Sequence, residues 1–311
     1  MNKQPILSIC IPIYNRLSYL DKMLARFLED KDLFREKIEL FVSDNCSQDD
    51  LAACCEKYRQ QGLKMDYHRN DENLGPDRNF ELCFYHAKGQ FTWLLGSDDI
   101  PVCGFVRKML CCLDNHDYGL FHLSMKKLPK VLTAYNDNNE MAVAVRYYIT
   151  FMSANIIRTD SLHDIEINHY RNTNLIQVPV FLNACLTAKE NAIYADGYPF
   201  EKGSDGRNNG GYHLFRVFVS NLFGIYEIFV EKGLLSVESF SKIKEIEFKE
   251  FLVNWILNLL IFKSNHNFET TGSWRILWKY YGRSPYAYWG LFKGMMSSAV
   301  VYLKLRINRW V

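Results

Sequence analysis

Zinc-type cysteine spacing, long hydrophobic runs and a strong net charge are all missing from this sequence. Its nine cysteines include no C-x-x-C pair, which argues against a structural zinc site. Their odd number, and the apolar surroundings of several, favour free thiols in a reducing cytoplasm. The apolar run at 251–262 is too short to cross a bilayer, and the N-terminal run is too short for a signal peptide. A net charge of +2 gives no global field that would attract nucleic acid.

Acidic residues are absent from the end of the chain. None follows Glu269, and residues 285–311 are rich in aromatic and apolar side chains. This composition is typical of a segment that lies on the anionic inner face of a membrane. A C-terminal helix packed on the rest of the protein explains the pattern equally well. The basic residues of this part are Arg275, Lys279, Arg283, Lys293, Lys304, Arg306 and Arg309.

Strand-like and helix-like segments alternate through the first 125 residues. Such alternation predicts an α/β fold, with a mostly parallel sheet flanked by helices on both faces. Ligands of such sheets bind beyond the carboxyl ends of the strands. Ser47 is expected to cap the second helix, and Pro76 to lie in the first turn of the third. The strands are expected at 6–13, 38–44, 64–70, 90–96 and 118–124, and the helices at 17–30, 47–62, 75–89 and 102–116.

The remainder of the chain has a weaker pattern that turns helical after residue 211. We expect two domains, residues 1–211 and a helical C-terminal region at 212–311. A polar, glycine-rich loop at 194–211, in the first domain, is either a mobile lid over a ligand or an ordinary surface loop. The expected elements are a strand at 151–159, a helix at 174–188 interrupted near Pro179, and a polar, glycine-rich loop at 194–211.

Two adjacent carboxylates follow an apolar strand in "WLLGSDDI", residues 93–100. Either Asp98 or Asp99 caps the next helix by accepting its free N–H groups, or the pair binds a divalent cation through hard oxygen ligands. A cation at this place would neutralise charge on a leaving diphosphate. The triplet Ser97, Asp98 and Asp99 does not by itself decide between a helix cap and a cation site.

Four strand-end motifs together resemble the family 2 inverting glycosyltransferases, which have the GT-A nucleotide-sugar-binding fold. The motifs are "IPIYNR", "VSDNCSQDD", "NLGPDRN" and "GSDD", and the resemblance covers residues 5–125. Asn73, Gly75, Arg78 and Asn79 match the third motif of the family, whereas Asp77 stands where alanine is usual. The resemblance implies a Rossmann-like nucleotide-sugar site.

The resemblance also assigns roles to individual residues. Tyr14 would offer an aromatic face to the nucleobase, Asp44 would accept a hydrogen bond from the base, and Arg78 would reach the diphosphate or pair with Asp77. Each has a structural alternative: a core-edge aromatic, a turn-former and an ion pair. The implied nucleotide-sugar-binding residues are Pro12, Tyr14, Asn15, Asp44, Asn73, Gly75, Arg78, Ser97 and Asp98.

The resemblance implies that Asp99 and Asp98 bind a divalent cation, Mn²⁺ or Mg²⁺. Asp99 is the more strongly implied metal ligand and is also the implied catalytic residue. Gly96 stands where many members of the family have an acid, so one ribose contact is missing from the expected site.

The base that should deprotonate the acceptor hydroxyl cannot be assigned. The family usually supplies it in an acidic pair 80–90 residues beyond the metal motif, but no acid occurs between Glu166 and Glu190. His213 is either a further metal ligand or a structural histidine. The candidate bases are Asp160, Asp164, Glu166, His169, Asp196, Glu201 and Asp205.

The sequence therefore predicts a cytoplasmic, metal-dependent glycosyltransferase. It would move a sugar, with inversion, from a nucleoside-diphosphate-sugar donor to a saccharide or lipid-linked saccharide, in the synthesis of a bacterial capsule or O-antigen. A nucleotidyltransferase is a rival, although "IPIYNRLSY" has no glycine for a phosphate loop. A catalytically degenerate scaffold that binds a nucleotide sugar in a polysaccharide assembly complex is the other.

Overall fold

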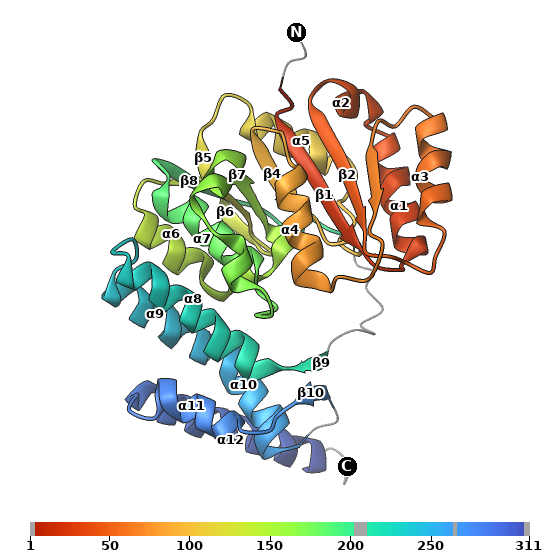
Figure 1. The fold of residues 1–311 in the computed structure, drawn as a ribbon. Coiled ribbons are helices and arrows are strands. Elements are labelled where there is room, and N and C mark those ends of the chain that lie inside the picture. The colour runs from red at the N-terminus through yellow and green to blue at the C-terminus, as the bar shows by residue number, and fades with distance from the viewer. Residues whose placement is uncertain (1–3, 202–209, 264–265, 308–311) are drawn as a thin grey trace. The chain divides into compact units, whose positions relative to one another are not determined.

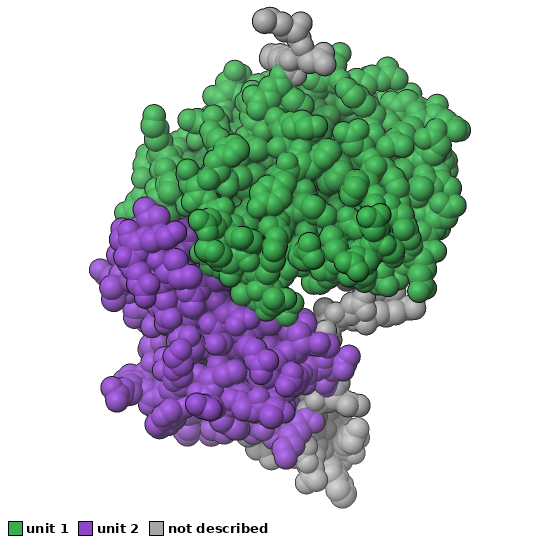
Figure 2. Space-filling view, viewed as in Figure 1, with its two compact units in different colours: residues 1–205 green, residues 206–311 purple. Residues whose placement is uncertain are grey.

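The computed structural model describes residues 4–201, 210–263 and 266–307. The chain forms two compact units, residues 1–205 and 206–311, which Figure 2 shows in green and purple. The first unit is an α/β sheet flanked by helices, and the second is mainly helical (Figure 1).

Eight strands in the described part of the first unit form one sheet, in the order β3-β2-β1-β4-β7-β5-β8-β6. The four strands β3, β2, β1 and β4 are parallel to one another, as are β5 and β8. β7 and β6 run antiparallel to their neighbours. The predicted mostly parallel sheet is confirmed. The strands are β1 Leu7–Ile13, β2 Ile38–Asp44, β3 Asp66–Arg69, β4 Phe91–Leu94, β5 Tyr118–Leu123, β6 Lys127–Tyr135, β7 Asn155–Arg158 and β8 Glu190–Asp196.

Helices cover both faces of this sheet, so β1 is buried along its whole length. One face packs on α1, α3 and α5 to form the main hydrophobic core. α4 and α7 lie in front of the strands in Figure 1, where Phe84 of α4 packs edge-on against Phe181 of α7. The helices of this unit are α1 Leu17–Leu28, α2 Lys31–Glu36, α3 Leu51–Gln60, α4 Pro76–His86, α5 Phe105–Leu113, α6 Asn138–Val145 and α7 Gln177–Thr187. Short 3₁₀ turns are η1 Arg146–Thr150, η2 Met152–Ala154, η3 Thr159–Asp164 and η4 Ile167–Tyr170.

Three local expectations are wrong. Asp50, not Ser47, caps α3, because its side chain accepts the Ala53 N–H. α7 is not interrupted at Pro179, which lies in its first turn, where a missing N–H leaves no hydrogen bond unmade. The expected loop at 194–211 begins later, because β8 runs on to Asp196; residues 202–209 of that loop lie outside the described residues.

The described residues of the second unit form helices and one short pair of strands. α12 packs within this unit through its glycines: a Cβ at Gly294 would lie 2.7 Å from Leu257 Cδ1, so the helices approach closely there. Among the described residues, no helix combines the length and hydrophobicity needed to cross a membrane. The strands are β9 Gly210–His213 and β10 Asn267–Glu269. The helices are η5 Arg216–Asn221, α8 Leu222–Glu231, α9 Val237–Glu247, η6 Phe248–Leu252, α10 Val253–Trp255, η7 Ile256–Ile261, α11 Ser273–Tyr281 and α12 Pro285–Ile307, with η5, η6 and η7 of the π type.

Candidate functional site

The turn after β1 and the turn after β4 meet through an ion pair. Asn15 and Arg16 follow β1 with φ of 58° and 66°, a left-handed conformation that non-glycine residues rarely adopt. Arg16 Nη1 lies 2.9 Å from Asp98 Oδ1 and 3.3 Å from Ser97 Oγ. Both charged side chains are about one-third exposed. A cation and a carboxylate therefore share the carboxyl edge of the sheet, where the motifs predict the site.

Asp99 is held inward, in contrast to Asp98. Its Oδ2 accepts a 2.6 Å hydrogen bond from the Ser153 hydroxyl. The Ser153 Oγ in turn accepts a 2.8 Å hydrogen bond from the Gly96 N–H. Burial raises the pKa of the Asp99 carboxyl to about 6; the neighbouring Asp98 also raises it, whereas Ser153 and Arg16 oppose the shift. Asp99 is therefore part of a hydrogen-bonded support beneath the more open Asp98.

Neither aspartate caps the following helix. α5 begins after Gly104, its N-cap residue, and has no side-chain cap, so the capping alternative is wrong. The same support leaves no room for a side chain at Gly96, because a Cβ there would lie 2.5 Å from Asp99 Oδ2. The inward position of the Asp99 carboxylate therefore requires glycine at residue 96.

Residues 198–201, near the end of the first unit, lie beside Ile100, which follows Asp99. The Glu201 N–H donates to the Ile100 carbonyl at 2.7 Å. In this segment burial raises the pKa of Tyr198, and the charges of Asp99 and Asp98 add to the shift. Tyr198 was not among the predicted site residues; its position three residues before Glu201 in a polar stretch is the only sequence signal.

The loops after β1 and β2 are fastened to each other. The Asn15 N–H donates to Ser47 Oγ at 2.7 Å, and Asn15 Oδ1 accepts the Gln48 N–H at 2.9 Å. Asp49 Oδ2 accepts the first N–H of α1, from Leu17. The strained turn is thus held by the β2 loop, and it leaves the adjacent Tyr14 44% exposed beside the site.

Pro12 lies inside β1, opposite Ser43 of β2, and is buried. The pairing of β1 with β4 ends at Cys10, so the N–H that proline lacks faces no strand partner. Pro12 is therefore a buried strand residue, two positions before the exposed Tyr14.

Asp44 is fully buried, and its carboxylate is used within the protein. One oxygen accepts the Ser47 N–H at 2.8 Å, and the other accepts the Tyr67 hydroxyl at 2.7 Å and lies 3.6 Å from Arg69 Nε. These contacts favour a role in fixing the β2 loop. Hydrogen bonding of Asp44 to a nucleobase stays a prediction.

A network of amide side chains builds the turn before α4. Asn45 Nδ2 donates to Asn73 Oδ1 at 2.8 Å, and the same oxygen accepts the Gly75 N–H at 2.9 Å. Beneath it, Asn79 Oδ1 accepts the Ser43 hydroxyl at 2.7 Å. Gly75 has φ of 78°, which only glycine adopts without strain. Asn73 and Gly75 therefore shape the turn, and Asn79 joins α4 to β2.

Arg78 is exposed and does not pair with Asp77, so that alternative is wrong. The Asp77 carboxylate instead faces the turn before α7, where the Asn174 N–H donates to it at 3.2 Å. Burial raises the pKa of Asp77, and backbone N–H groups of residues 172–176 oppose that shift. The residue that departs from the family pattern thus holds a distant segment.

One helical turn further on, Glu81 holds the same segment. Its carboxylate forms a two-pronged ion pair with Arg171, in which Nε donates to Oε2 at 2.9 Å and Nη2 donates to Oε1 at 2.8 Å. Glu81 is buried, whereas Arg171 is partly exposed. No sequence pattern predicts this contact, because the two residues are ninety positions apart in the chain.

One candidate base, Asp160, lies at the edge of the sheet opposite to Asp98. Asp160 pairs with Arg158 at 3.4 Å, and the adjacent Thr159 N–H bonds to Gln90 at the start of β4, the opposite edge of the sheet. This position disfavours Asp160 as the acceptor base. His213 belongs to the second unit; its Nδ1 accepts the Arg216 N–H and its Nε2 lies 2.8 Å from the Thr271 carbonyl, which favours the structural alternative.

The other candidates are ion-paired or exposed. Glu166 and His169 pair with each other at 2.9 Å, and Asp164 is exposed. The remaining two lie nearer the site: Asp196 has its pKa lowered by Lys108, which makes it a weaker base, and Glu201 pairs with Arg26 of α1. Asp205 lies outside the described residues.

The side chains at the carboxyl edge suit a hard divalent cation. Asp98 and Asp99 offer carboxylate oxygens and Ser97 a hydroxyl, the ligand type that Mg²⁺ and Mn²⁺ prefer. The guanidinium of Arg16 already places a positive charge against Asp98. The more open Asp98 fits the role of ligand better than the inward Asp99.

Comparison with protein families and known proteins gives a consistent result. The family described as glycosyl transferase family 2 matches residues 8–189. Abequosyltransferase RfbV of Salmonella typhimurium is 39% identical over 95 residues, which is 30% of this chain and 28% of that protein. Poly(ribitol-phosphate) beta-N-acetylglucosaminyltransferase TarS of Staphylococcus aureus is 24% identical over 196 residues, 61% of this chain and 34% of that protein. The chain thus spans about a third or less of these relatives.

Solved structures share the fold. The crystal structure of S. aureus TarS 1-349 in complex with UDP-GlcNAc superposes with a TM-score of 0.64 at 20% identity, and covers 88% of this chain and 80% of that one. Mannosyltransferase PcManGT from Pyrobaculum calidifontis, in complex with GDP-Man and Mn²⁺, gives a TM-score of 0.52 at 12% identity over 97% of this chain and 88% of that one. At these identities the likeness establishes the GT-A fold.

Proposed function

The chain belongs to glycosyl transferase family 2, and from this membership we propose that it transfers a sugar from a nucleoside-diphosphate donor to a hydroxyl of a saccharide or lipid-linked saccharide acceptor. The named relatives, an abequosyltransferase and a poly(ribitol-phosphate) beta-N-acetylglucosaminyltransferase, support a role in bacterial surface-polysaccharide synthesis. Family membership speaks against the nucleotidyltransferase alternative.

The observation that carries this proposal is the meeting of the β1 and β4 turns at the carboxyl edge. Arg16, Ser97 and Asp98 converge there, with Asp99 braced beneath them by Ser153. Parallel α/β sheets bind their ligands at this edge. An exposed tyrosine, Tyr14, stands next to the cluster and would stack on the nucleobase.

We assign the divalent cation, Mn²⁺ or Mg²⁺, to Asp98, with Asp99 and Ser97 completing the oxygen set. Bound there, the cation would neutralise negative charge on the diphosphate as it leaves. Arg16, which is 2.9 Å from Asp98, is placed to pass from this carboxylate to the diphosphate of the donor. The exposed Arg78, in the turn before α4, would contact the donor from the neighbouring strand end.

Transfer with inversion requires a base on the acceptor side. Among the described candidates, Glu201 is the one whose backbone is bonded to the segment after Asp99, at Ile100. Its carboxylate is held by Arg26. We therefore place Glu201 first among the candidate bases and Tyr198, beside it, at the wall of the acceptor site.

A peripheral position at the inner face of the cell membrane suits a lipid-linked acceptor. The second unit exposes a set of aromatic side chains, here called the aromatic surface, and two cavities share Tyr288, so the surface is continuous. Basic side chains such as Arg283 and Lys293 accompany it. The aromatic surface consists of Trp274, Trp278, Tyr288, Trp289 and Phe292.

The proposal is tested by comparing Asp98→Asn with the wild type in donor hydrolysis and transfer assays with Mn²⁺. We expect at least ~100-fold less turnover, which corresponds to ~2.7 kcal/mol of transition-state stabilisation. The matched control is Asp117→Asn, which alters an exposed carboxylate paired with Arg158 at the opposite edge. Donor binding without turnover by the wild type, over a broad acceptor panel, would instead support the scaffold alternative.

A further inference from the structure

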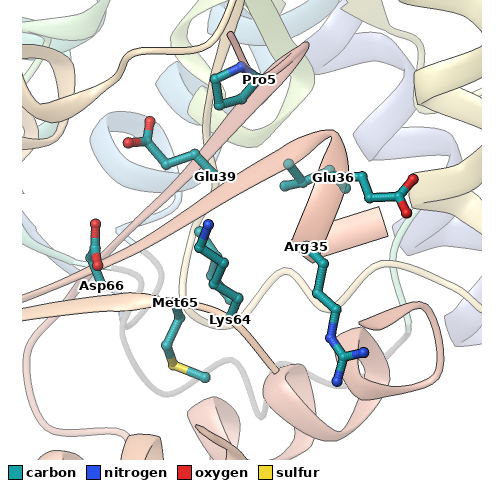
Figure 3. A pocket seen from close by; sticks show the side chains of 9 residues that line it. Pro5, Arg35, Glu36, Glu39, Lys64, Met65 and Asp66 are labelled. Carbon is teal, nitrogen blue, oxygen red and sulfur yellow. The ribbon is translucent and has the colours of Figure 1, made fainter. Parts of the chain in front are cut away.

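A second group of metal-ligand side chains lies at the amino ends of the strands, opposite to Asp98. Glu39 is the second residue of β2, Asp66 opens β3, and His86 ends α4. One ligand atom from each lies within 4.8 Å of the other two. Glu39 and Asp66 line a cavity of about 290 Å³ together with Arg35 and Lys64. Figure 3 labels these four side chains.

The imidazole of His86 has an unpartnered nitrogen at the centre of this group. Nε2 is buried and forms no hydrogen bond with any described residue; it lies 3.5 Å from Asp66 Oδ2 and 3.9 Å from Glu39 Oε1. These distances are too long for good hydrogen bonds. Two ligands of one tetrahedral ion, each about 2 Å from it, lie about 3.3 Å apart, so the Asp66 distance is close to that of shared ligands and the Glu39 carboxylate would move slightly closer on binding. The ring stacks on Phe41 with centroids 3.6 Å apart and planes 11° apart, which fixes its direction.

The carboxylate of Glu39 is oriented by other groups. Its Oε2 accepts hydrogen bonds from the Ser8 hydroxyl and from the Lys88 N–H, the latter at 2.9 Å, so Oε1 is the atom left to face His86. Partners of this kind orient the ligands of protein metal sites. Lys88 Nζ lies 3.7 Å from Oε1, but this side chain is 67% exposed and free to turn into solvent.

The donor set differs from the one at Asp98. One imidazole nitrogen and two carboxylate oxygens, with a fourth side open to a cavity, are the ligands of zinc in proteins, whereas the oxygen-only set at Asp98 suits Mg²⁺ or Mn²⁺. We propose that Glu39, Asp66 and His86 bind a Zn²⁺ ion at the amino edge of the sheet. The ion would fasten the edge strand β3 to β2 and to the end of α4.

The test is a Zn²⁺ titration of the full chain in competition with a fluorescent chelator, with bound metal counted by mass spectrometry. We expect one zinc equivalent in the wild type. His86→Gln and Asp66→Asn should each weaken zinc affinity by at least ~10-fold. Asp66 is exposed at the edge of the sheet, so D66N tests the site even where H86Q fails to fold; circular dichroism monitors both.

The controls separate this site from the catalytic one and from adventitious histidine binding. Asp98→Asn should keep the zinc affinity of the wild type, whatever its effect on transfer. His169→Gln, which removes an exposed histidine beside a carboxylate, should also keep it. Equal zinc affinity in the wild type, H86Q and D66N would overturn the proposal. So would a wild type without bound zinc, in which case the three residues form only an ion pair.

Discussion

Gly96 is fixed by the position of the Asp99 carboxylate, and substitution there tests the support beneath the site. In Gly96→Ala the new Cβ would lie 2.5 Å from Asp99 Oδ2 and 3.1 Å from Ser153 Oγ, so the Asp99–Ser153 hydrogen bond must break. We expect a loss of ~1–3 kcal/mol in the free energy of unfolding, as for other overpacked sites. Transfer should fall at least ~10-fold, because Asp98 is displaced with its neighbour. Urea denaturation and the transfer assay measure the two effects.

Gly224→Ala is the matched control. This glycine lies within α8, and a Cβ there would meet no atom within 4 Å. Alanine should therefore stabilise the helix by ~0.5–1 kcal/mol and leave transfer unchanged. Wild-type activity and stability in Gly96→Ala would show that Asp99 tolerates another position.

Glu247 makes the stability of the second unit depend on pH. It is fully buried, neither carboxylate oxygen has a hydrogen-bond partner in the part of the chain that the structure describes, and burial raises its pKa well above the ordinary value. The folded chain therefore keeps a proton that the unfolded chain releases near pH ~4.3. Between that pH and the raised pKa, the free energy of unfolding should fall by up to ~1.4 kcal/mol per pH unit.

Glu247→Gln should remove this slope. Wild type and variant should have similar pH dependence below the ordinary glutamate pKa, and the advantage of the variant should grow as pH rises toward the folded-state pKa. Urea denaturation followed by tryptophan fluorescence reports on this unit, which holds five of the six tryptophans. Glu245→Gln, at an exposed site paired with Lys249, should leave the slope in place. A parallel pH profile in wild type and Glu247→Gln would contradict the prediction.

Single residues of the site differ in how far the sequence predicts them. Asp98, Ser97 and Tyr14 lie where their motifs place them, because strand ends and short turns are set by local sequence. Arg16 and Ser153 were not foreseen. Their contacts to the aspartates cross 82 and 54 residues of chain, and depend on the packing of loops that carry no pattern of their own.

At the scale of elements, α4 holds the segment before α7 through Asp77 and Glu81. Removing Arg171 would leave the Glu81 carboxylate buried without its counter-charge. Because Arg171 is partly exposed, we expect Arg171→Leu to cost ~2–3 kcal/mol, slightly below the range for fully buried pairs. Urea denaturation measures this cost.

A double-mutant cycle distinguishes the ion pair from lost packing. Glu81→Leu combined with Arg171→Leu should recover much of the stability, because no buried charge is then left unpaired. Strictly additive losses in the double variant would rule out the coupling. The control Lys57→Leu breaks the exposed Asp21–Lys57 pair and should change stability by less than ~1 kcal/mol.

Apart from the short helix α2 (Lys31–Glu36), the elements of the first 125 residues were predictable, because their polar and apolar periods are regular and their helices are bounded by residues such as Pro76. β6 and β8 were missed for different reasons. β6 is an exposed edge strand that includes a proline, so it has no buried alternation. β8 merges with a polar segment that continues past Asp196. The two strands form an antiparallel pair, so their formation depends on contacts between separate parts of the chain.

At the scale of the whole molecule, net positive charge and exposed aromatic residues are concentrated in the second unit. No acid follows Glu269, and Trp278 and Trp289 are 69% and 57% exposed. α12 uses Gly290 and Gly294 to pack on its own unit, so the neighbouring aromatic side chains remain outside. An anionic bilayer surface complements both features, since indole rings partition into the interface and basic residues approach the lipid phosphates.

We therefore expect the chain to sediment with vesicles that contain an anionic phospholipid, and to do so less as salt concentration rises. Trp278→Ser with Trp289→Ser should weaken binding by ~10-fold or more, because each indole contributes ~1.5–3 kcal/mol when buried. Val237→Ser, at a 73% exposed apolar residue on α9, should have no effect. Equal sedimentation of the double variant and the wild type would exclude the aromatic surface as the contact. Salt-insensitive binding to neutral vesicles would exclude the electrostatic part, because the basic residues would then add nothing to affinity.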